Sequence, residues 1–385
     1  MFWFWFFVAP AIALAFRSVM GERARAAYIE RRLFEQPVYL PPATVIVPVK
    51  GEDEGLCENL AALASLDYPD YELIVVAHSA TDIPPGVLPP RAKVVLAHME
   101  ESGASEKVLN LAAAVRAARK HSQILAFADS DGRVTARWLG ALAAPLAEPG
   151  VGASTGYRWF TPERSAFWSL VRSVWDSVPA GMLGPEKNRF AWGGAMAMRR
   201  DTFFEIGVLE HWKGAISDDY ALSAVVRAAG LTIAYAPGAL VRCLEGTTAR
   251  RLFRWMRRQM MLTRVYNPEQ WWPGLVTHLF YCGGMVASGI AVVTGHRLGA
   301  WSLVAQLGPG MVKGWRRARL ARLALPESAN ARIWLCLRAS RTAAARFSTF
   351  SEAPDSSIWA STTFARGGST PGGISAAECA TTISS

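Results

Sequence analysis

The sequence predicts an α/β domain with a doubly wound, mostly parallel sheet, carried between N-terminal and C-terminal membrane helices. Two observations lead to this fold class. Short, nearly continuous apolar stretches alternate with helix-like stretches between residues 43 and 129, as expected for β-α-β units whose sheet is covered on both faces. Long apolar segments lie before and after this region, and 51% of the 385 residues are hydrophobic. In such a sheet, ligands bind beyond the carboxyl ends of the strands.

The expected elements of this domain follow one another with short connections. β-branched and other apolar residues mark the strands, and longer Ala/Leu-rich stretches mark the helices. Strands are predicted at Thr44–Val49, Glu72–Ala77, Lys93–Ala97 and Gln123–Asp129, and helices at Leu56–Ser65 and Ser105–Lys120.

The N-terminal segment is predicted to be a retained membrane anchor, residues 1–20. An unbroken apolar run from Phe2 to Phe16 would cover about 22 Å of the ~30 Å hydrocarbon core, which is short for a span. A signal peptide is the competing interpretation. It is disfavoured because no basic residues precede the run and Ser18–Gly21 is a poor cleavage site.

A second apolar region indicates a membrane hairpin with a basic flank, residues 270–325. Its two arms run from Trp271 to Val293 and from Leu298 to Val312. The basic residues behind the net charge of +10 gather beside the apolar segments, which favours membrane flanks on the cytoplasmic side and argues against a nucleic-acid partner. Solvated helix faces are the alternative explanation. The Ser/Thr/Ala/Gly-rich residues 326–385 are predicted to be a disordered, low-complexity tail.

The strongest local motif is Asp129-Ser130-Asp131, which follows an apolar strand. Two carboxylates at a strand tip suit Mg²⁺ or Mn²⁺ bound to a substrate pyrophosphate, because these ions prefer oxygen ligands and leave positions open for phosphates. Aspartates are also frequent in turns. The position after a buried strand favours the metal site.

Two further motifs carry charge at predicted helices. Asp218 and Asp219 precede a helix-like segment, where a cap would explain one aspartate more easily than two. Arg251 and Arg254 share one helix face beside Trp255 and could approach phosphate oxygens, while the indole offers a flat surface for a sugar or a lipid. An interfacial helix near lipid headgroups would explain the same residues.

At the end of the first strand, Pro48, Lys50 and Gly51 stand where a doubly wound sheet would hold a nucleotide. The segment is not a P-loop, and no G-x-G-x-x-G occurs there, so a dinucleotide cofactor is unsupported.

Taken in order, VPVKGED, Asp82, DSD, SDDY and RLFRW resemble the family 2 glycosyltransferases, most closely the ceramide glucosyltransferase group and its bacterial, including hopanoid-associated, relatives. The resemblance covers roughly residues 44–264 and implies a GT-A-type nucleotide-sugar domain, here residues 37–265. DYPDYE, residues 67–72, is also similar to that group.

The resemblance assigns roles residue by residue. It implies that the nucleotide pocket contains Pro48, Lys50, Gly51, Asp82 and Asp129, and that Asp129 and Asp131 bind the metal. It also implies that Asp219 of the Asp218-Asp219 pair is the general base. Arg251, Arg254 and Trp255 match the Q/R-x-x-R-W motif. One departure concerns Asp82. Many family 2 enzymes have D-D-G-S-T-D where this chain has residues 77–82, AHSATD.

The function expected from these residues is inverting, metal-dependent transfer of a hexose from a nucleotide-diphosphate sugar, such as a UDP-sugar, to a lipid hydroxyl such as ceramide or a hopanoid. Asp219 would take the acceptor proton while the cations stabilise the leaving pyrophosphate. A processive polysaccharide synthase is the alternative enzyme, and a non-catalytic membrane scaffold of the same fold is the alternative outside enzymes. The chain is expected to be a multi-pass membrane protein whose catalytic domain faces the cytoplasm.

Overall fold

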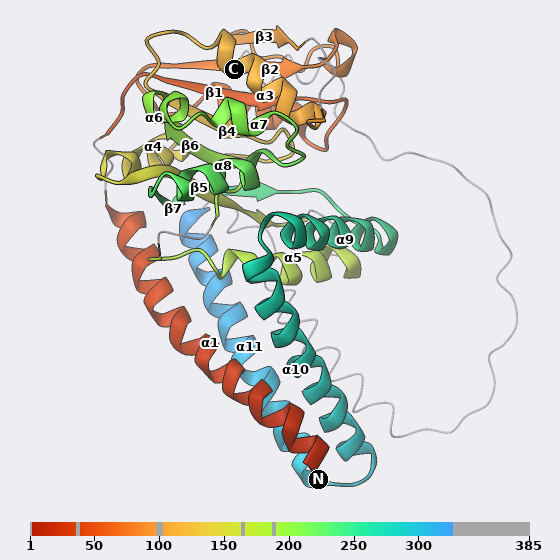
Figure 1. The fold of residues 1–385 in the computed structure, drawn as a ribbon. Coiled ribbons are helices and arrows are strands. Elements are labelled where there is room, and N and C mark those ends of the chain that lie inside the picture. Colours follow the sequence, from red (N-terminus) through yellow and green to blue (C-terminus); the bar gives the residue numbers. More distant parts are fainter. Residues whose placement is uncertain (1, 36–38, 98–102, 163–165, 187–189, 326–385) are drawn as a thin grey trace, which may run out of the picture.

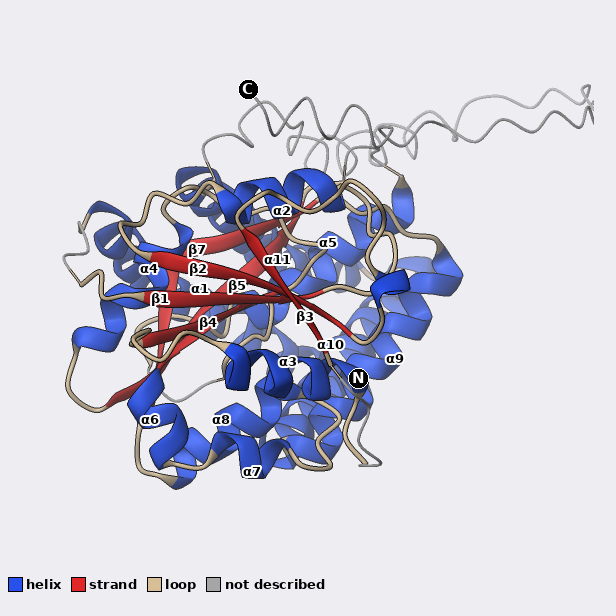
Figure 2. Ribbon diagram, turned by 90° about the horizontal axis from the view of Figure 1, so that it is seen from above, coloured by secondary structure: helices blue, strands red, loops and turns tan. Residues whose placement is uncertain are grey.

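Seven strands form one mixed sheet in the order β3-β2-β1-β4-β6-β5-β7 (Figures 1 and 2). The computed structural model describes residues 2–35, 39–97, 103–162, 166–186 and 190–325. Neighbouring strands are parallel except β6, which runs antiparallel to both β4 and β5. The strands are β1 Ala43–Pro48, β2 Tyr71–Ala77, β3 Ala92–Leu96, β4 Ile124–Ala128, β5 Val151–Phe160, β6 Ala195–Arg199 and β7 Thr232–Cys243.

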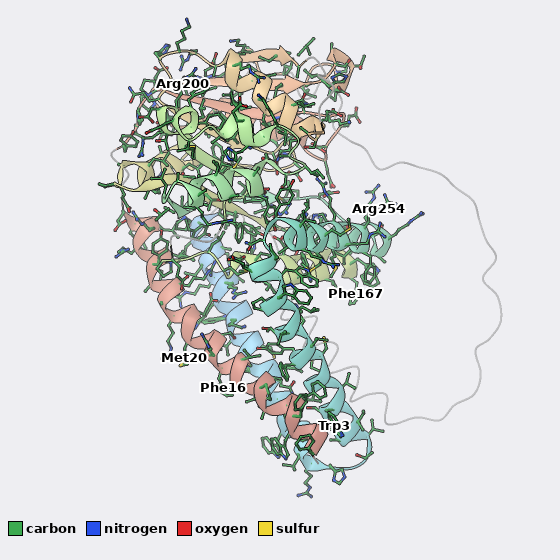
Figure 3. The ribbon with its side chains drawn as sticks, in the orientation of Figure 1. Trp3, Phe16, Met20, Phe167, Arg200 and Arg254 are labelled. Carbon is green, nitrogen blue, oxygen red and sulfur yellow. The ribbon has the colours of Figure 1, made fainter. Side chains whose placement is uncertain are left out.

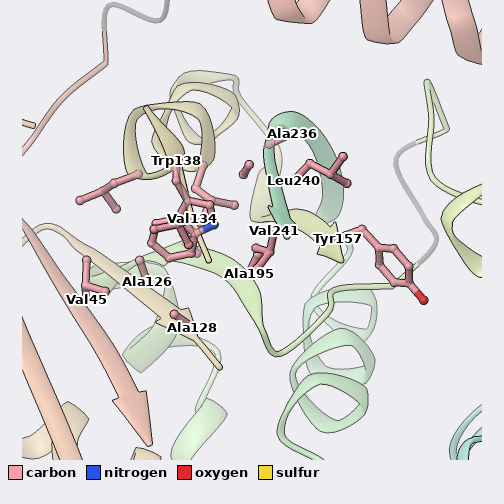
Figure 4. Packing of buried hydrophobic residues seen from close by; sticks show 14 of the residues in the cluster. Val45, Ala126, Ala128, Val134, Trp138, Tyr157, Ala195, Ala236, Leu240 and Val241 are labelled. Atoms are coloured by element: carbon pink, nitrogen blue, oxygen red, sulfur yellow. The ribbon is translucent and has the colours of Figure 1, made fainter. Parts of the chain in front are cut away.

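Helices cover both faces of this sheet, which explains why its central strands are apolar without interruption. Along β1, Val45 and Val47 pack into one hydrophobic cluster and Ile46 into the other. Figure 4 shows part of the first cluster around Trp138 and Ala126. The covering helices are α2 Leu56–Ala64, η2 Ala144–Ala147 and α4 Trp138–Ala143 on the first face, and α3 Glu106–Ala117, α6 Arg200–Glu205, α7 Val208–Trp212 and α8 Asp218–Ala228 on the second.

The predicted mostly parallel α/β sheet is confirmed, and the four strands and two helices expected before residue 130 are all present within a few residues of their predicted ends. β5, β6 and β7 were not among the expected elements. The antiparallel β6 follows the Gly-rich segment before Ala195, a composition that carries no strand signal of its own.

Three long helices leave the sheet domain together: α1 Phe2–Phe34, α10 Pro268–Val293 and α11 Arg297–Ala324. Figure 1 shows the N-terminus and the α10–α11 turn at the same far end of this bundle. α1 and α10 are long and apolar enough to cross a membrane, by length and composition alone. α10 and α11 form a helical hairpin that turns at Gly295, whose φ of 80° suits a left-handed turn residue. α11 is not among the candidate membrane spans of the described residues, so the second arm of the membrane hairpin stays a prediction.

The N-terminal helix is longer than the predicted anchor of residues 1–20. It continues to Phe34, because its second half packs on the domain: the Tyr28 hydroxyl donates to the Tyr235 carbonyl at 2.6 Å. Within these thirty-three residues, an 18-residue window, about 27 Å of helix, is apolar enough for a span, while the charged second half lies against the domain. The predicted tail at residues 326–385 lies outside the described residues.

A charged cluster fixes the bundle to the domain. The buried carboxylate of Glu22 accepts hydrogen bonds from Arg25 and from Arg317 of α11, each at 2.9 Å. Arg25 also donates to the Leu183 carbonyl at 2.8 Å, and Arg317 donates to the Ser177 carbonyl at 2.7 Å. Because each cation bonds both an anion and the domain backbone, the three helices are oriented relative to the sheet.

Two further helices lie crosswise between the sheet and the bundle, α5 Phe167–Ala180 and α9 Ala249–Tyr266 (Figure 1). Within the bundle, α10 and α11 approach closely at Gly299, where an added Cβ would lie 2.6 Å from the Ser288 carbonyl oxygen and from the Val292 nitrogen. Small residues permit such close backbone contact between packed helices.

We therefore expect Gly299→Leu to separate α10 from α11 and to destabilise the protein by about 2 kcal/mol, because the added side chain overpacks a tight contact. Gly289→Leu is the matched control, since an added Cβ at Gly289 meets no atom within 4 Å. The measurement is thermal unfolding of both detergent-solubilised variants. Equal midpoints for the two variants would show that the close contact does not hold the hairpin together.

Candidate functional site

The sheet brings the predicted metal ligands to its centre. β4 is buried between β1 and β6, and Asp129 and Asp131 follow directly from its carboxyl end. Asp131 Oδ1 is buried and has no hydrogen-bond partner among the described residues. Burial and the neighbouring Asp129 carboxylate, against the opposing effect of Arg158, raise the pKa of Asp131 to about 6. A buried carboxylate oxygen without a donor fits a ligand of a divalent cation.

Lys107 of α3 joins the two acidic motifs. Its Nζ lies 2.7 Å from Oδ1 of Asp129 and 3.2 Å from Oδ1 of Asp218. Burial lowers the pKa of Lys107, but the carboxylates of Asp129, Asp218 and Asp219 outweigh it, and the pKa is raised. The ammonium therefore stays charged and neutralises part of the acidic site.

A pair of glycines makes this approach of the two motifs sterically possible. At Gly193 an added Cβ would lie 2.4 Å from Oδ2 of Asp218, and at Gly194 it would lie 2.6 Å from Oδ2 of Asp129. The chain entering β6 thus passes against both carboxylates with no room for a side chain.

The two adjacent aspartates at the start of α8 have different surroundings. Asp218 is buried, and burial raises its pKa to about 6 although Lys107 opposes the shift. Asp219 is partly exposed. Its Oδ1 accepts hydrogen bonds from the Ser217 hydroxyl and from the Tyr220 amide, the latter at 2.7 Å, and its Oδ2 accepts from the Gly193 amide at 3.2 Å. The Asp219 carboxylate is therefore held in one orientation and remains accessible to solvent.

A cavity of about 300 Å³ opens at the ends of β1 and β4, beside Asp129 and Asp131; Asp218 and Asp219 do not line it. Of the predicted nucleotide and metal residues it brings together Pro48, Lys50, Asp129 and Asp131. Its remaining lining is Val49, Asp53, Glu106, Lys107, Asn110 and Ser130. A larger cavity of about 570 Å³, bordered by α6 and α8, contains none of the predicted site residues.

Gly51 and Asp82 are not among the residues that line the cavity of about 300 Å³, and they contact each other. The Gly51 amide donates to the Asp82 carbonyl at 2.7 Å, and Gly51 has a φ of 71°, which favours glycine. The Asp82 carboxylate accepts from the Ser79 amide at 2.9 Å and so caps the short helix η1, Ala80–Asp82. In this arrangement Asp82 shapes the loop and does not line the cavity.

The arginine and tryptophan motif is confirmed to be helical, but its two arginines face outward while Trp255 faces the domain. Leu252 and Trp255 turn toward the domain, with the Trp255 ring 5.0 Å from that of Trp175. Arg251 and Arg254 each precede an inward residue and are rotated from it by about 100° on the helix. Both are exposed, Arg254 extends away from the domain in Figure 3, and neither guanidinium bonds to another described residue.

Arg158, near the end of β5, packs among aromatic side chains. Its guanidinium carbon lies 5.2 Å from the ring centre of Trp192 and 5.3 Å from that of Trp255. Its Nε lies 3.5 Å from Asp176 of α5, and its charge acts on Asp131. Arg158 therefore supplies a shielded positive charge beside the predicted metal ligand.

Lys107, Asn110 and Arg158 were missed as functional residues from the sequence. A signal for the first two existed: they lie three residues apart, on one face of an otherwise Ala- and Leu-rich helix. Asn110 is buried with its Oδ1 unpaired among the described residues. No local pattern marked Arg158, since only the parallel pairing of β5 with β7 places it.

The sequence and the fold were compared with known proteins. Residues 3–341 match glycosyl transferase family 21. No curated protein matches the chain. Among solved structures, the mannosyltransferase PcManGT from Pyrobaculum calidifontis, in complex with GDP-Man and Mn²⁺, is similar in fold, with a TM-score of 0.50 and 20% identity over 85% of this chain and 99% of that chain. GalNAc-T7, solved with UDP, GalNAc and Mn²⁺, gives a TM-score of 0.40 and 13% identity over 54% of this chain and 44% of that chain.

These comparisons confirm the expected GT-A-like fold and the expected relationship to the ceramide glucosyltransferase group. The family match extends well beyond the motif region, into the apolar helices at both ends. The chain belongs to glycosyl transferase family 21, and it is a glycosyltransferase.

Proposed function

We propose that this glycosyltransferase is metal-dependent and inverting, and that it moves a hexose from a nucleotide-diphosphate sugar, best a UDP-sugar, to a lipid hydroxyl such as that of ceramide or a hopanoid. One observation carries the proposal. The Asp129/Asp131 and Asp218/Asp219 pairs are about 90 residues apart in sequence, but they lie in one site, where Lys107 bonds to one carboxylate of each pair.

The residues present fit a divalent cation held jointly with the donor. No group of three or more His, Cys, Asp or Glu side chains in the described part of the chain is arranged to bind a metal alone. A site of two carboxylates, Asp129 and Asp131, completed by donor phosphates is the arrangement that Mg²⁺ or Mn²⁺ favours. When bound, the ion would stabilise negative charge on the leaving pyrophosphate. The similar mannosyltransferase was solved with Mn²⁺.

The protein's own residues account for the remaining steps. Pro48, Lys50 and Asn110 line the donor cavity, while Lys107 and Arg158 place positive charge near the leaving phosphates. Asp219 is held by its three donors and accepts the proton of the acceptor hydroxyl as the new glycosidic bond forms and the bond to the nucleotide breaks. A single displacement inverts the anomeric centre.

The helices at both ends support a lipid acceptor. The bundle of α1, α10 and α11 joins the domain on the side where α9 packs against the Asp219 region, through the Tyr220 and Thr263 hydroxyls at 2.8 Å. A bilayer around the bundle would bring lipid headgroups to that side. The basic residues at the domain end of the bundle, among them Arg25 and Arg317, favour a cytoplasmic domain in a multi-pass protein.

The alternatives weighed from the sequence have less support. Family membership makes the chain an enzyme, so a non-catalytic scaffold is set aside. A processive synthase must thread its polymer through a channel. Here the small residues and hydrogen bonds among Ser288, Ser302 and Gln306 close α10 against α11, which favours transfer of a single sugar.

Asp219→Asn should abolish transfer while keeping donor binding, because the amide preserves the shape of the side chain but cannot accept the proton. We expect a loss of roughly a hundred- to ten-thousandfold in turnover. The exposed Asp201→Asn on α6 serves as a control. The measurements are turnover and calorimetric affinity for the nucleotide diphosphate. Normal turnover by the Asp219 variant would refute the base assignment.

Chelation of divalent cations should stop both transfer and release of nucleotide diphosphate, and added Mn²⁺ or Mg²⁺ should restore them. Asp131→Asn should require more metal for half-maximal activity, because an amide is a weaker cation ligand than a carboxylate. Titration of the chelated enzyme with each ion provides the measurement. Full activity in excess chelator would rule out the metal role.

The product should be a lipid that carries one sugar. Incubating the enzyme in membranes with a radiolabelled nucleotide sugar, followed by organic extraction and thin-layer chromatography with mass detection, tests this expectation. A labelled product that stays in the aqueous phase as a polymer would favour the processive synthase instead.

A further inference from the structure

Helix α5 has an inverted pattern of burial. Its buried positions include the polar and charged residues Ser169, Arg172 and Asp176, while apolar Phe167 and Val174 are 69% and 59% exposed. In a water-facing helix the apolar face turns toward the core. An outward apolar face with its charges turned inward is expected where the outside is itself apolar.

The buried charges of α5 are satisfied by the domain and bind the helix to it. Arg172 Nη1 lies 3.0 Å from Glu245 and its guanidinium carbon lies 4.1 Å from the Phe160 ring centre. Asp176 accepts from the Tyr157 hydroxyl at 3.3 Å and faces Arg158. The helix is therefore fixed in rotation, and its apolar face stays outward.

The outward face is continuous with the membrane bundle and with α9. Arg317 of α11 donates to the Ser177 carbonyl of α5 at 2.7 Å, which places the helix at the domain end of the bundle. Trp168 contacts Phe253 of α9, with ring centres 6.2 Å apart, so the apolar surface extends onto that helix. Figures 1 and 3 show both helices crosswise to the bundle, as a helix lying in a membrane surface would be.

Arginines border this surface on α9. Arg250, Arg257 and Arg264 are exposed and lie at i−3, i+4 and i+11 from Phe253, on the same helical face. Guanidinium groups beside an apolar face suit phospholipid phosphates, with the aromatic rings in the boundary below them. The occupant that matches this combination is a phospholipid bilayer.

We propose that α5, with Phe253 of α9, docks in the headgroup boundary of the bilayer and holds the catalytic site at a fixed height above it. The connection to the site is short: Asp176 of α5 contacts Arg158, whose charge acts on Asp131. This inference rests on the membrane location within the proposed function.

The test is photo-crosslinking of the full-length protein in phosphatidylcholine–phosphatidylglycerol nanodiscs. p-Benzoylphenylalanine replaces Phe167, and in a matched variant it replaces Phe204, an exposed aromatic residue on α6 (44% exposed). A third variant carries it at Trp301 of α11, which is 71% exposed in the bundle. Each change keeps an aromatic ring at an exposed site, so folding should be preserved.

We expect peptides containing position 167 to gain the mass of a phospholipid after irradiation, as those containing position 301 do, with no gain at position 204. No adduct at 167, or the same yield at 167 and 204, would overturn the docking of α5. The outcome is independent of sugar transfer: adducts at 167 and 301 without glycolipid product would refute the proposed acceptor and leave the docking intact. An adduct at 301 alone would leave the bundle in the bilayer and remove α5 from it.

Discussion

The concentration of carboxylates at the end of β4 is the constraint on which the rest of the site depends. Asp129, Asp131 and Asp218 come together there, and burial raises the pKa of both Asp131 and Asp218. The Lys107 ammonium offsets part of the cost of burying these charges, because its Nζ lies 2.7 Å from Asp129 and 3.2 Å from Asp218. Two glycines give the carboxylates room, and Arg158 adds a second positive charge. An acidic site with this remaining negative charge is suited to a cation that arrives with a phosphorylated donor.

Buried charges also set how the sheet domain joins the long helices. The sheet is covered on both faces, but its edge near β5 and β7 meets α5, α9 and the bundle. Charged residues at these junctions point inward and face opposite charges, as Glu22 does with Arg317 and Asp176 with Arg158. Apolar residues are left to face outward. The orientation of the domain relative to the long helices is thereby set by buried hydrogen bonds and ion pairs.

Much of this could be predicted from sequence because the signals were local. Continuous apolar runs marked β1, β2 and β4, and Asp129 and Asp131 followed from their place after such a run. The antiparallel β6 could not be predicted, since its segment AMAMR reads equally well as helix and is fixed by pairing with β4 and β5. Lys107 and Arg158 were missed for a related reason: their roles come from contacts between residues far apart in the chain. The outward direction of Arg251 and Arg254 depended on the helical phase of α9, which Leu252 and Trp255 set by packing inward.

The central claim is that one carboxylate, Asp219, acts opposite a leaving group held at Asp129 and Asp131, so that the sugar is displaced once. The stereochemistry of the product tests this most directly. Nuclear magnetic resonance of the anomeric proton, in glycolipid made by the membrane-embedded enzyme from an α-linked donor, distinguishes the two outcomes. The account predicts a β-linked product. An α-linked product would require a second displacement or front-side attack, and it would contradict the assignment of the site.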